Sequence, residues 1–405
     1  MIREKASIAV LGTFDSKGEE HQFLETRIQE RGCRTMTINV GTGRPPSRPV
    51  HVDFYGELKD EEKELSRDQA IAEVISRAKT RVRRLHEDGG ISGIISAGGG
   101  TGTHICTSIM RVLPLGVPKV MVSTVASRDM SEVVGTKDIT MMHSVSDILG
   151  INSVTGRILD NAAGAVCGMV SDRWQAGSAK KRVALSFFGF ITRAAENVRE
   201  RLENLGYEVI PFHANGTGGM AMMELASEGY FDGILDLATH ELADAFMDGY
   251  CGAIGEKRFE PVPGPPVPRL TVPGGMDCIV LEFTRDSIPP QFRDRQIFFY
   301  DFRSAIRVNA GESRLLAAQL SEKLNMDPGN VRVLIPLRGM SEADEENAPL
   351  HNPAAGQAFI NAFKDGLAPG IDVETANLHI NDPLFADRAA SVMDEMIKTA
   401  ERTPF

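Results

Sequence analysis

Residues 91–107 read ISGIISAGGGTGTHICT and hold, at their centre, four glycines and three hydroxyl side chains behind a short apolar run. Glycine loses much backbone entropy on folding, so such a cluster indicates a tight turn or the close approach of another group. The pattern predicts a strand, a turn and a helix. The turn either presents backbone N–H groups to a phosphate or carboxylate or is a plain tight connection. Its glycines exceed what a turn requires, which favours a ligand.

The flanking sequence places this turn in an alternating pattern of strands and helices. Short β-branched runs, SIAVLG, TMTINVG, SGIISA and KVMVST, alternate with helical stretches at residues 19–31, at 68–87 and from about Thr103. Such alternation is typical of a parallel sheet with helices on both faces, in which ligands bind where strands end. The glycine turn occupies one of these positions.

A second, similar cycle begins at Ala184 and suggests an internal duplication. Gly-Thr-Gly stands at residues 41–43 and again at 216–218, SGIISA resembles DGILDLA, and PKVMVST resembles PRLTVPG. The alternative is that any two Rossmann-like units look alike at this level. In both cases we expect an α/β protein with two Rossmann-like domains and mainly parallel sheets, residues 1–178 and 179–405.

Composition narrows the class of protein. The chain has 405 residues, 42% of them hydrophobic, and a net charge of −11, which argues against a general binder of nucleic acid or anionic membranes. No segment has the apolar length of a membrane span, and the N-terminus is expected to be a first strand rather than a signal peptide. The five cysteines form no CxxC pair, so we expect reduced thiols in a cytoplasmic protein rather than disulfides or a zinc site.

The loop GTFDSKG at residues 12–18 follows the first strand, which is usually central, so the loop is expected to face the ligand crevice. Asp15 can hold magnesium or a hydroxyl group, and Lys17 can neutralise a phosphate. The loop is not a Walker A motif, because no Gly-Lys-Ser/Thr is present. In the alternative interpretation Asp15 or Ser16 caps a helix and Lys17 lies in solvent.

Three further stretches are candidates. In VSTVASRD, Thr124 and Ser127 can bond phosphate or ribose oxygens and Arg128 can reach an anion, unless the segment is only a capped helix start. NGTGG at residues 215–219 is taken as the second unit's counterpart of the glycine turn. The long loop 337–353 is of the kind that carries function, and the proline-rich residues 261–268 form a connector or rim loop.

Other chemistries find little support. His213 and His240 stand at expected strand ends, but no HxxH or HExxH spacing indicates a metal site. No GxSxG elbow supports a Ser–His–Asp triad. Residues 98–103 also miss the dinucleotide fingerprint, which needs Gly or Ala where Thr103 stands.

The motifs GTFDSKG, SAGGGTGT, VSTVASRD, MMHSVSDILGIN, NGTGG and RGMSEAD…NDPLFAD, in this order, resemble the UPF0261 family, that of the Tm-1-like ATP-binding domain. The resemblance covers nearly the whole chain. It implies two Rossmann-like domains, binding of ATP with magnesium, and self-association as a homodimer or higher homo-oligomer. It does not imply a reaction.

Together with the loops above, the resemblance gives a set of site residues. The residues expected to contact the nucleotide are Gly12, Thr13, Asp15, Lys17, Gly98, Gly99, Gly100, Thr101, Gly102, Thr124, Ser127, Asn215, Gly216, Thr217 and Gly218. Asp15 is the expected metal ligand, and Asp15, Lys17 and Arg338 are the groups expected to do polar chemistry.

The sequence thus predicts a protein that binds ATP or a similar nucleotide, with slow hydrolysis or ATP-dependent small-molecule chemistry if it is an enzyme. Two alternatives remain. The first is a nucleotide-sensing interaction protein without turnover. The second is an enzyme acting on a carboxylate or sugar-acid substrate, with the glycine loops binding carboxylate, so a small acidic metabolite is a further expected partner.

Overall fold

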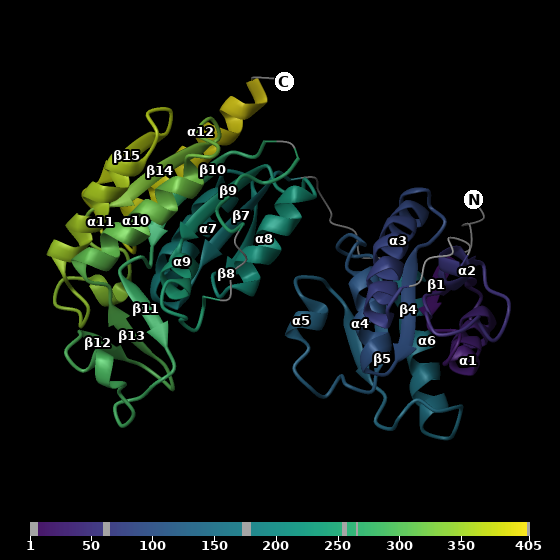
Figure 1. Ribbon diagram of the computed structural model, residues 1–405. Helices are drawn as coiled ribbons and strands as arrows, with labels where there is room; N and C mark the ends of the chain where they lie inside the picture. Colours follow the sequence, from purple (N-terminus) through teal and green to yellow (C-terminus); the bar gives the residue numbers. More distant parts are fainter. Residues whose placement is uncertain (1–6, 60–64, 172–179, 253–256, 265, 403–405) are drawn as a thin grey trace. The chain divides into compact units, whose positions relative to one another are not determined.

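The computed structural model describes residues 7–59, 65–171, 180–252, 257–264 and 266–402 (Figure 1). The chain forms two compact units, Met1–Gly177 and Ser178–Phe405. The expected domain boundary at residue 178 lies outside the described residues. Each unit is built on a six-stranded parallel sheet, so the predicted α/β fold class with Rossmann-like units is confirmed.

The N-terminal unit has a single sheet in the order β3-β2-β1-β4-β5-β6, with every neighbouring pair parallel. Its strands are β1 (Ser7–Gly12), β2 (Arg34–Asn39), β3 (Val52–Asp53), β4 (Gly93–Gly98), β5 (Lys119–Ser123) and β6 (Thr140–His143). β4 and β5 are buried throughout and β1 at all but its first residue, as expected for strands covered on both faces.

Helices cover both faces of this sheet. Its helices are α1 (Gly18–Glu30), α2 (Phe54–Lys59), α3 (Arg67–Glu87), α4 (Gly100–Met110), α5 (Ser131–Val134) and α6 (Thr155–Ser171). α2, α3 and α4 pack on one face, and α1 and α6 pack on the other. In α3, Val74, Ala78 and Val82 recur every four residues and form the buried stripe of the helix.

The C-terminal unit has a parallel sheet in the order β15-β14-β10-β9-β7-β8, plus a three-stranded antiparallel sheet. The strands of the large sheet are β7 (Arg182–Phe187), β8 (Glu208–His213), β9 (Gly233–Ala238), β10 (Arg269–Gly274), β14 (Val331–Pro336) and β15 (Asp372–Ala376). The small sheet comprises β11 (Cys278–Leu281), β12 (Ile297–Phe299) and β13 (Ser304–Arg307). The sequence pattern did not predict this second sheet.

Helices again lie on both faces of the large sheet. They are α7 (Thr192–Asn204), α8 (Thr217–Ser227), α9 (His240–Ala245), α10 (Ala310–Leu324), α11 (Pro353–Gly366) and α12 (Pro383–Arg402), with short 3-10 helices η1 (Gly189–Ile191), η2 (Pro290–Phe292) and η3 (Glu342–Asp344). α7 and α12 share one core cluster, whereas α10 and α11 share another with the small sheet.

The strands paired by the suspected repeat occupy equivalent places. β2-β1-β4-β5 and β8-β7-β9-β10 follow the same order in the two sheets, as a duplication would produce. This topology also corrects one detail. Residues 215–219 follow β8, so their equivalent is the loop after β2 and not the glycine turn, which follows β4.

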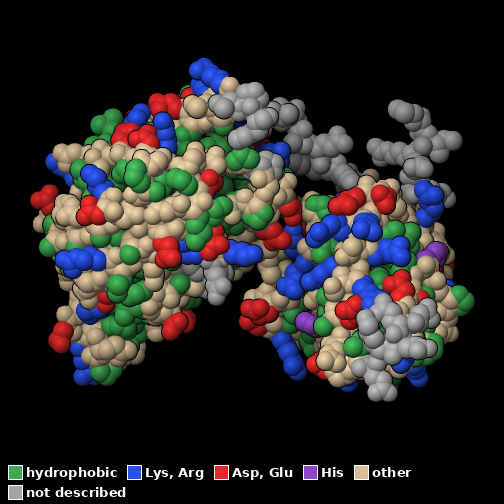
Figure 2. All heavy atoms as spheres, turned by 45° about the horizontal axis from the view of Figure 1, so that its top comes forward, with side chains coloured by type: hydrophobic (Ala, Val, Ile, Leu, Met, Phe, Trp, Pro, Cys, Tyr) green, Lys and Arg blue, Asp and Glu red, His purple; other side chains and the backbone are tan. Residues whose placement is uncertain are grey.

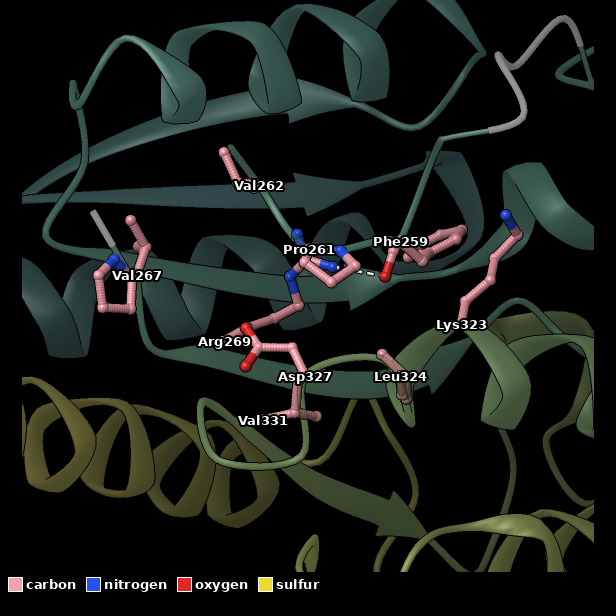
Figure 3. A pocket seen from close by; sticks show the side chains of 10 residues that line it. Phe259, Pro261, Val262, Val267, Arg269, Lys323, Leu324, Asp327 and Val331 are labelled. Atoms are coloured by element: carbon pink, nitrogen blue, oxygen red, sulfur yellow. Dashed lines mark hydrogen bonds between the residues drawn. The ribbon is translucent and has the colours of Figure 1, made fainter. Parts of the chain in front are cut away.

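Two local features refine the sequence reading. α4 begins at Gly100 rather than near Thr103, so two of the glycines lie inside its first turn. The proline-rich residues 261–268 form neither helix nor strand where they are described, and they border a cavity of about 20 Å³ beside Arg269 and Asp327 (Figure 3). That volume holds about one water molecule and no ligand. Among the described helices, none has the length and apolarity needed to cross a bilayer.

Candidate functional site

The two N-terminal loops singled out in the sequence lie at the point where the strand order reverses. The chain proceeds from β1 outward through β2 and β3, then returns to β4 on the other side of β1 and continues to β5. The loops that follow β1 and β4 therefore leave adjacent strands at the same sheet edge. Open α/β sheets bind ligands at this position.

The glycine turn leads directly from β4 into α4. Gly99 is the N-cap residue of α4, and the Thr103 N–H group donates to the Gly99 carbonyl at 2.8 Å. No side chain caps the helix, and no acidic residue stands in its first turn. The N–H groups of this turn thus form a positively polarised helix end without an internal carboxylate.

The structural reason for having glycine differs between positions of the turn. A Cβ atom on Gly98 would lie 3.2 Å from the Gly102 Cα atom, so close packing accounts for Gly98. A Cβ atom on Gly100 or Gly102 would meet nothing within 4 Å, and neither residue has a positive φ. Glycine in a helix costs about 1 kcal/mol relative to alanine. Neither packing nor backbone conformation therefore requires glycine at these two positions.

An open depression of about 1020 Å³ adjoins the turn. α4 contributes Gly100, Thr101 and the exposed His104 to it, and α3 contributes an apolar strip around Ile71 and Ile75 as well as Lys79. Lys and Arg side chains gather on the visible face of the N-terminal unit (Figure 2). The lining of the depression thus comprises the backbone of the turn, an apolar wall, the ammonium group of Lys79 and the carboxylate of Asp68.

Asp15, in the loop after β1, is held by its neighbours. Its carboxylate accepts hydrogen bonds from the Gly43 N–H group at 3.1 Å and the Ser16 hydroxyl at 3.1 Å. A Cβ atom on Gly41 would lie 2.5 Å from this carboxylate, which explains the Gly-Thr-Gly of residues 41–43. Asp15 therefore joins the loops after β1 and β2.

Lys17 is the N-cap residue of α1, and it is half-buried rather than exposed to solvent. Its ammonium group donates to the Ile148 carbonyl. An ammonium group has three donors, so two remain. The alternative in which Asp15 or Ser16 caps the helix is therefore wrong.

His21 supports this loop and was not selected from the sequence. Its Nδ1 atom lies 2.6 Å from the Lys17 carbonyl, and its Nε2 atom lies 3.5 Å from the Ala97 nitrogen on β4. Burial lowers the pKa of His21, so the ring is neutral. A Cβ atom on Gly12 would lie 1.9 Å from Nε2, which explains Gly12. The signal available in the sequence was the i, i+4 spacing of Lys17 and His21.

The remaining predicted residues of this unit lie at different distances from the turn. The Thr124 N–H group donates to the Gly98 carbonyl at 3.2 Å, and its hydroxyl oxygen lies 3.8 Å from the place of a Cβ atom on Gly99. Thr13 contacts the Ser16 hydroxyl at 3.2 Å. Ser127 is exposed. The structure thus brings Thr124 to the turn, and no described contact does so for Ser127.

The loop at residues 215–219 already has an internal anion. The N–H groups of Gly216 and Gly219 donate to Glu241 Oε1 at 2.8 and 3.2 Å, and the Gly218 N–H group donates to Asn215 Oδ1 at 3.1 Å. Gly216 has a φ of 90°. A Cβ atom on Gly218 would lie 2.0 Å from the His213 carbonyl oxygen.

Thr217, the first residue of α8, is exposed. Contacts within the protein therefore account for Gly216, Gly218 and Gly219, so a bound ligand is not needed to explain why these positions are glycine.

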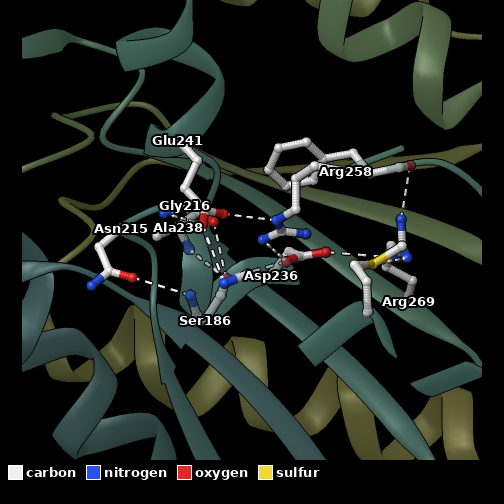
Figure 4. A network of polar contacts seen from close by, with 12 residues as sticks. Ser186, Asn215, Gly216, Asp236, Ala238, Glu241, Arg258 and Arg269 are labelled. Atoms are coloured by element: carbon white, nitrogen blue, oxygen red, sulfur yellow. Dashed lines mark hydrogen bonds and ion pairs between the residues drawn. The ribbon is translucent and has the colours of Figure 1, made fainter. Parts of the chain in front are cut away.

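Glu241 belongs to a buried ionic network (Figure 4). Arg258 lies 2.7 Å from both Glu241 and Asp236, and all three side chains are fully buried. Arg269 lies 3.6 Å from the other Asp236 oxygen. Ser186 donates to Asp236 at 3.2 Å. Two carboxylates and two guanidinium groups thus balance inside the C-terminal unit.

Arg338 lies elsewhere in this unit, at a cavity of about 580 Å³. It is exposed, and its Nε atom donates to Asn377 at 3.1 Å. His351, His379 and the acidic side chains of the 337–353 loop line the same cavity. Burial and the nearby Asp277 raise the pKa of Asp344 to about 7. Arg338 belongs to the C-terminal unit, whereas Asp15 and Lys17 belong to the N-terminal unit.

The comparisons with known proteins agree with this two-unit organisation. The N-terminal domain of the Uncharacterised protein family (UPF0261) matches residues 6–175, and its C-terminal domain matches residues 180–397. This chain belongs to the UPF0261 family.

Two curated relatives illustrate the range of the family. A UPF0261 protein from Clostridium tetani is 35% identical over 96% of this chain and 99% of its own length. The ToMV susceptible protein tm-1(GCR26) of Solanum lycopersicum is 33% identical over 95% of this chain and 55% of its own length. Among solved structures, Acinetobacter baumannii MurG covers 97% of this chain with 12% identity and a TM-score of 0.24, a likeness too weak to inform function.

Proposed function

We propose that this protein binds ATP or a similar phosphorylated nucleotide at the β4–α4 turn, with the phosphates on the N–H groups of residues 98–102. The observation that carries the proposal is the pair Gly100 and Gly102, which nothing inside the described structure requires to be glycine. Glycine at a helix start lets a phosphate approach the backbone closely.

The surroundings of the turn support a nucleotide rather than a bare phosphate. The apolar strip of Ile71 and Ile75 offers a surface for a base, and Lys79 supplies charge in the same depression. The Thr124 hydroxyl is the nearest side-chain donor to Gly99. In addition, the family resemblance carries an expectation of ATP with magnesium.

Asp15 and Lys17 have the chemistry for the metal and the charge. Magnesium commonly takes one or two protein carboxylates and completes its shell with water and phosphate oxygens. Asp15 keeps lone pairs beyond its two hydrogen bonds, and Lys17 keeps two donors beyond the Ile148 carbonyl. In this proposal Asp15 holds the magnesium ion and Lys17 neutralises the phosphates.

Isothermal titration with ATP, ADP and AMP, with and without magnesium, tests the site. Gly100→Val should weaken ATP binding at least tenfold, because its side chain fills the space above the turn. The matched control is Gly168→Val, since Gly168 lies in α6, is exposed and also has nothing within 4 Å of its Cβ position.

Both variants should keep a stability within about 0.5 kcal/mol of the wild type, because valine and glycine have similar helix propensities. Equal ATP affinities of the wild type and Gly100→Val would overturn the proposed site. A phosphate-release assay then separates an ATPase from a nucleotide sensor without turnover.

The cavity at Arg338 favours a second candidate function, binding of a small acidic metabolite in the C-terminal unit. Its volume of about 580 Å³ is typical of small-molecule sites. Its lining includes the guanidinium group of Arg338 and also four carboxylates, so an acidic ligand would have to bind through Arg338. The carboxylates are those of Asp344, Glu345, Glu346 and Asp382. Arg338→Ala should abolish any stabilisation of the protein by carboxylate or sugar-acid compounds, measured as a thermal shift, and leave ATP binding unchanged.

A further inference from the structure

A second site with unused chemistry lies at the carboxyl edge of the C-terminal sheet. His240 and Asp244 stand one turn apart on α9, directly after β9, and Cys251 follows in the next loop. One ligand atom of each residue lies within 4.8 Å of the others. This is the one such group of three or more potential metal ligands among the described residues. The three residues are 0%, 0% and 4% exposed.

The orientation of His240 is the second, independent observation. Its Nδ1 atom lies 2.9 Å from the Gly275 carbonyl, which can only accept, so Nδ1 carries the proton. Its fully buried Nε2 atom faces Asp244 Oδ1 at 3.3 Å, without the geometry of a directed hydrogen bond. Although burial opposes it, the charge of Asp244 raises the pKa of His240. Metal-bound histidines commonly donate their other N–H group to a backbone carbonyl in this way.

The surrounding structure fixes the carboxylate and the ring. Asp244 accepts hydrogen bonds from the Cys251 and Val280 N–H groups at 2.8 and 2.7 Å. The ring of Phe188 stacks on His240 with a centroid distance of 4.1 Å. The backbone of Cys251 and Val280 thus fixes the carboxylate, and Phe188 and the Gly275 carbonyl fix the ring.

A catalytic Cys–His–Asp triad fits this geometry less well than a metal. In a triad, the carboxylate binds one ring nitrogen and the nucleophile binds the other. Here the carbonyl of Gly275 occupies Nδ1, so Asp244 and Cys251 share the side of Nε2. A metal ion requires its ligand atoms to point toward one common position, and these three ligand atoms lie close enough together to do so.

We propose that His240, Asp244 and Cys251 form a structural site for a divalent metal ion of the zinc type. Nitrogen, sulfur and carboxylate ligands together suit zinc. A carboxylate and a thiolate balance the two positive charges, so the buried site is neutral. On binding, the Cys251 thiol and the Nε2 atom of His240 each release a proton to solvent, so that the metal bonds a thiolate sulfur and a neutral imidazole nitrogen. Three protein ligands leave the fourth position of a tetrahedral ion for a water molecule, and the ion ties α9 to the loop that holds Cys251.

This inference departs from the expectation drawn from the cysteine spacing. The ligands are separated by up to eleven positions and include a single cysteine, so no CxxC or HxxH pattern marks them. Cys278 also lies beside His240, and burial raises the pKa of its thiol to about 12.

Cobalt replacement tests the proposal on the full chain. The protein is unfolded with chelator, refolded with cobalt, freed of excess metal and examined by absorption spectroscopy and metal analysis. We expect one bound cobalt ion per chain, with the thiolate-to-cobalt charge-transfer band and the visible bands of a tetrahedral site. Cys251→Ser should lose the charge-transfer band and bind metal at least tenfold more weakly. The control Cys106→Ser, a buried thiol of the N-terminal unit, should keep both.

Two results would overturn the proposal. The first is a wild-type protein that refolds without stoichiometric cobalt or zinc. The second is an unchanged spectrum in Cys251→Ser and His240→Gln. Should these variants fail to fold, X-ray absorption on the wild-type zinc form decides, because a shell without sulfur also refutes the site. Titration with ATP is a separate readout, so failure of this proposal leaves the nucleotide site untouched.

Discussion

Replacing Arg258 by methionine is the most severe single test of the buried network in the C-terminal unit. Arg258 bonds Asp236 and Glu241 at 2.7 Å each, and the three side chains have no exposed surface. Arg258→Met keeps much of the volume and removes the charge. Among the described residues, it leaves Glu241 with two backbone N–H groups as partners, and leaves Asp236 with Ser186 and the more distant Arg269.

The expected cost is large because the remaining charges stay buried. Removing one partner of a buried ion pair typically destabilises a protein by about 3–5 kcal/mol, since the other charge is left without compensation. An exposed pair is typically worth about 0–1 kcal/mol. Arg388 and Glu374 form such a pair, with side chains 39% and 38% exposed, so Arg388→Met is the matched control.

Urea unfolding followed by hydrogen exchange, read on peptides of β9 and α8, measures the stability of this unit separately. We expect Arg258→Met to lower it by about 3–5 kcal/mol and Arg388→Met to have a small effect. The triple variant Arg258→Met, Asp236→Asn, Glu241→Gln should recover part of the loss, because it removes both carboxylates as well. Similar losses in the two single variants, or no recovery in the triple variant, would refute the reasoning.

Three further predictions concern other sites. The pKa of Asp344 is raised from 3.8 to about 7, so the folded state binds the extra proton and the stability of the C-terminal unit should fall as pH rises across this range. Asp344→Asn should flatten that part of the urea-unfolding profile, and an unaltered profile would contradict the assignment. Gly41→Ala should displace the Asp15 carboxylate, whose carbon lies 2.5 Å from the new Cβ position, and reduce the magnesium dependence of ATP binding in calorimetry. Lys17→Ala should weaken ATP binding by about 1.5–3 kcal/mol, the value of a charge-assisted contact, and an unchanged affinity would remove Lys17 from the site.

Much of the fold could be predicted from the sequence, because central parallel strands are buried on both faces and therefore stand out as continuous apolar runs. SIAVLG, SGIISA and KVMVST are rich in β-branched and small residues, and they contain β1, β4 and β5 or most of their residues. The small antiparallel sheet escaped notice because β12 and β13 are only three and four residues long and lie between turns. Such short runs show no clear period.

Residues of the candidate nucleotide site could be predicted only where the order of the strands along the chain determines which loops are neighbours. The loops after β1 and β4 are adjacent because of the sheet order, and their residues could be named from the sequence. The partners of the second glycine loop could not be predicted, because Glu241 reaches this loop from α9. The cluster of His240, Asp244 and Cys251 was missed for the same reason, since its geometry depends on packing rather than on spacing.

Because of Glu241, the start of α8 and the start of α4 differ in how readily they can bind an anion from solution. A carboxylate tethered to the same chain competes for the N–H groups of Gly216 and Gly219 at a fixed, high effective concentration, whereas phosphate must arrive from solution. The α8 terminus is therefore permanently saturated, while α4 has no acidic residue in its first turn to do the same. A dissolved anion can therefore approach the start of α4 without displacing a side chain, whereas at the start of α8 it must first displace Glu241.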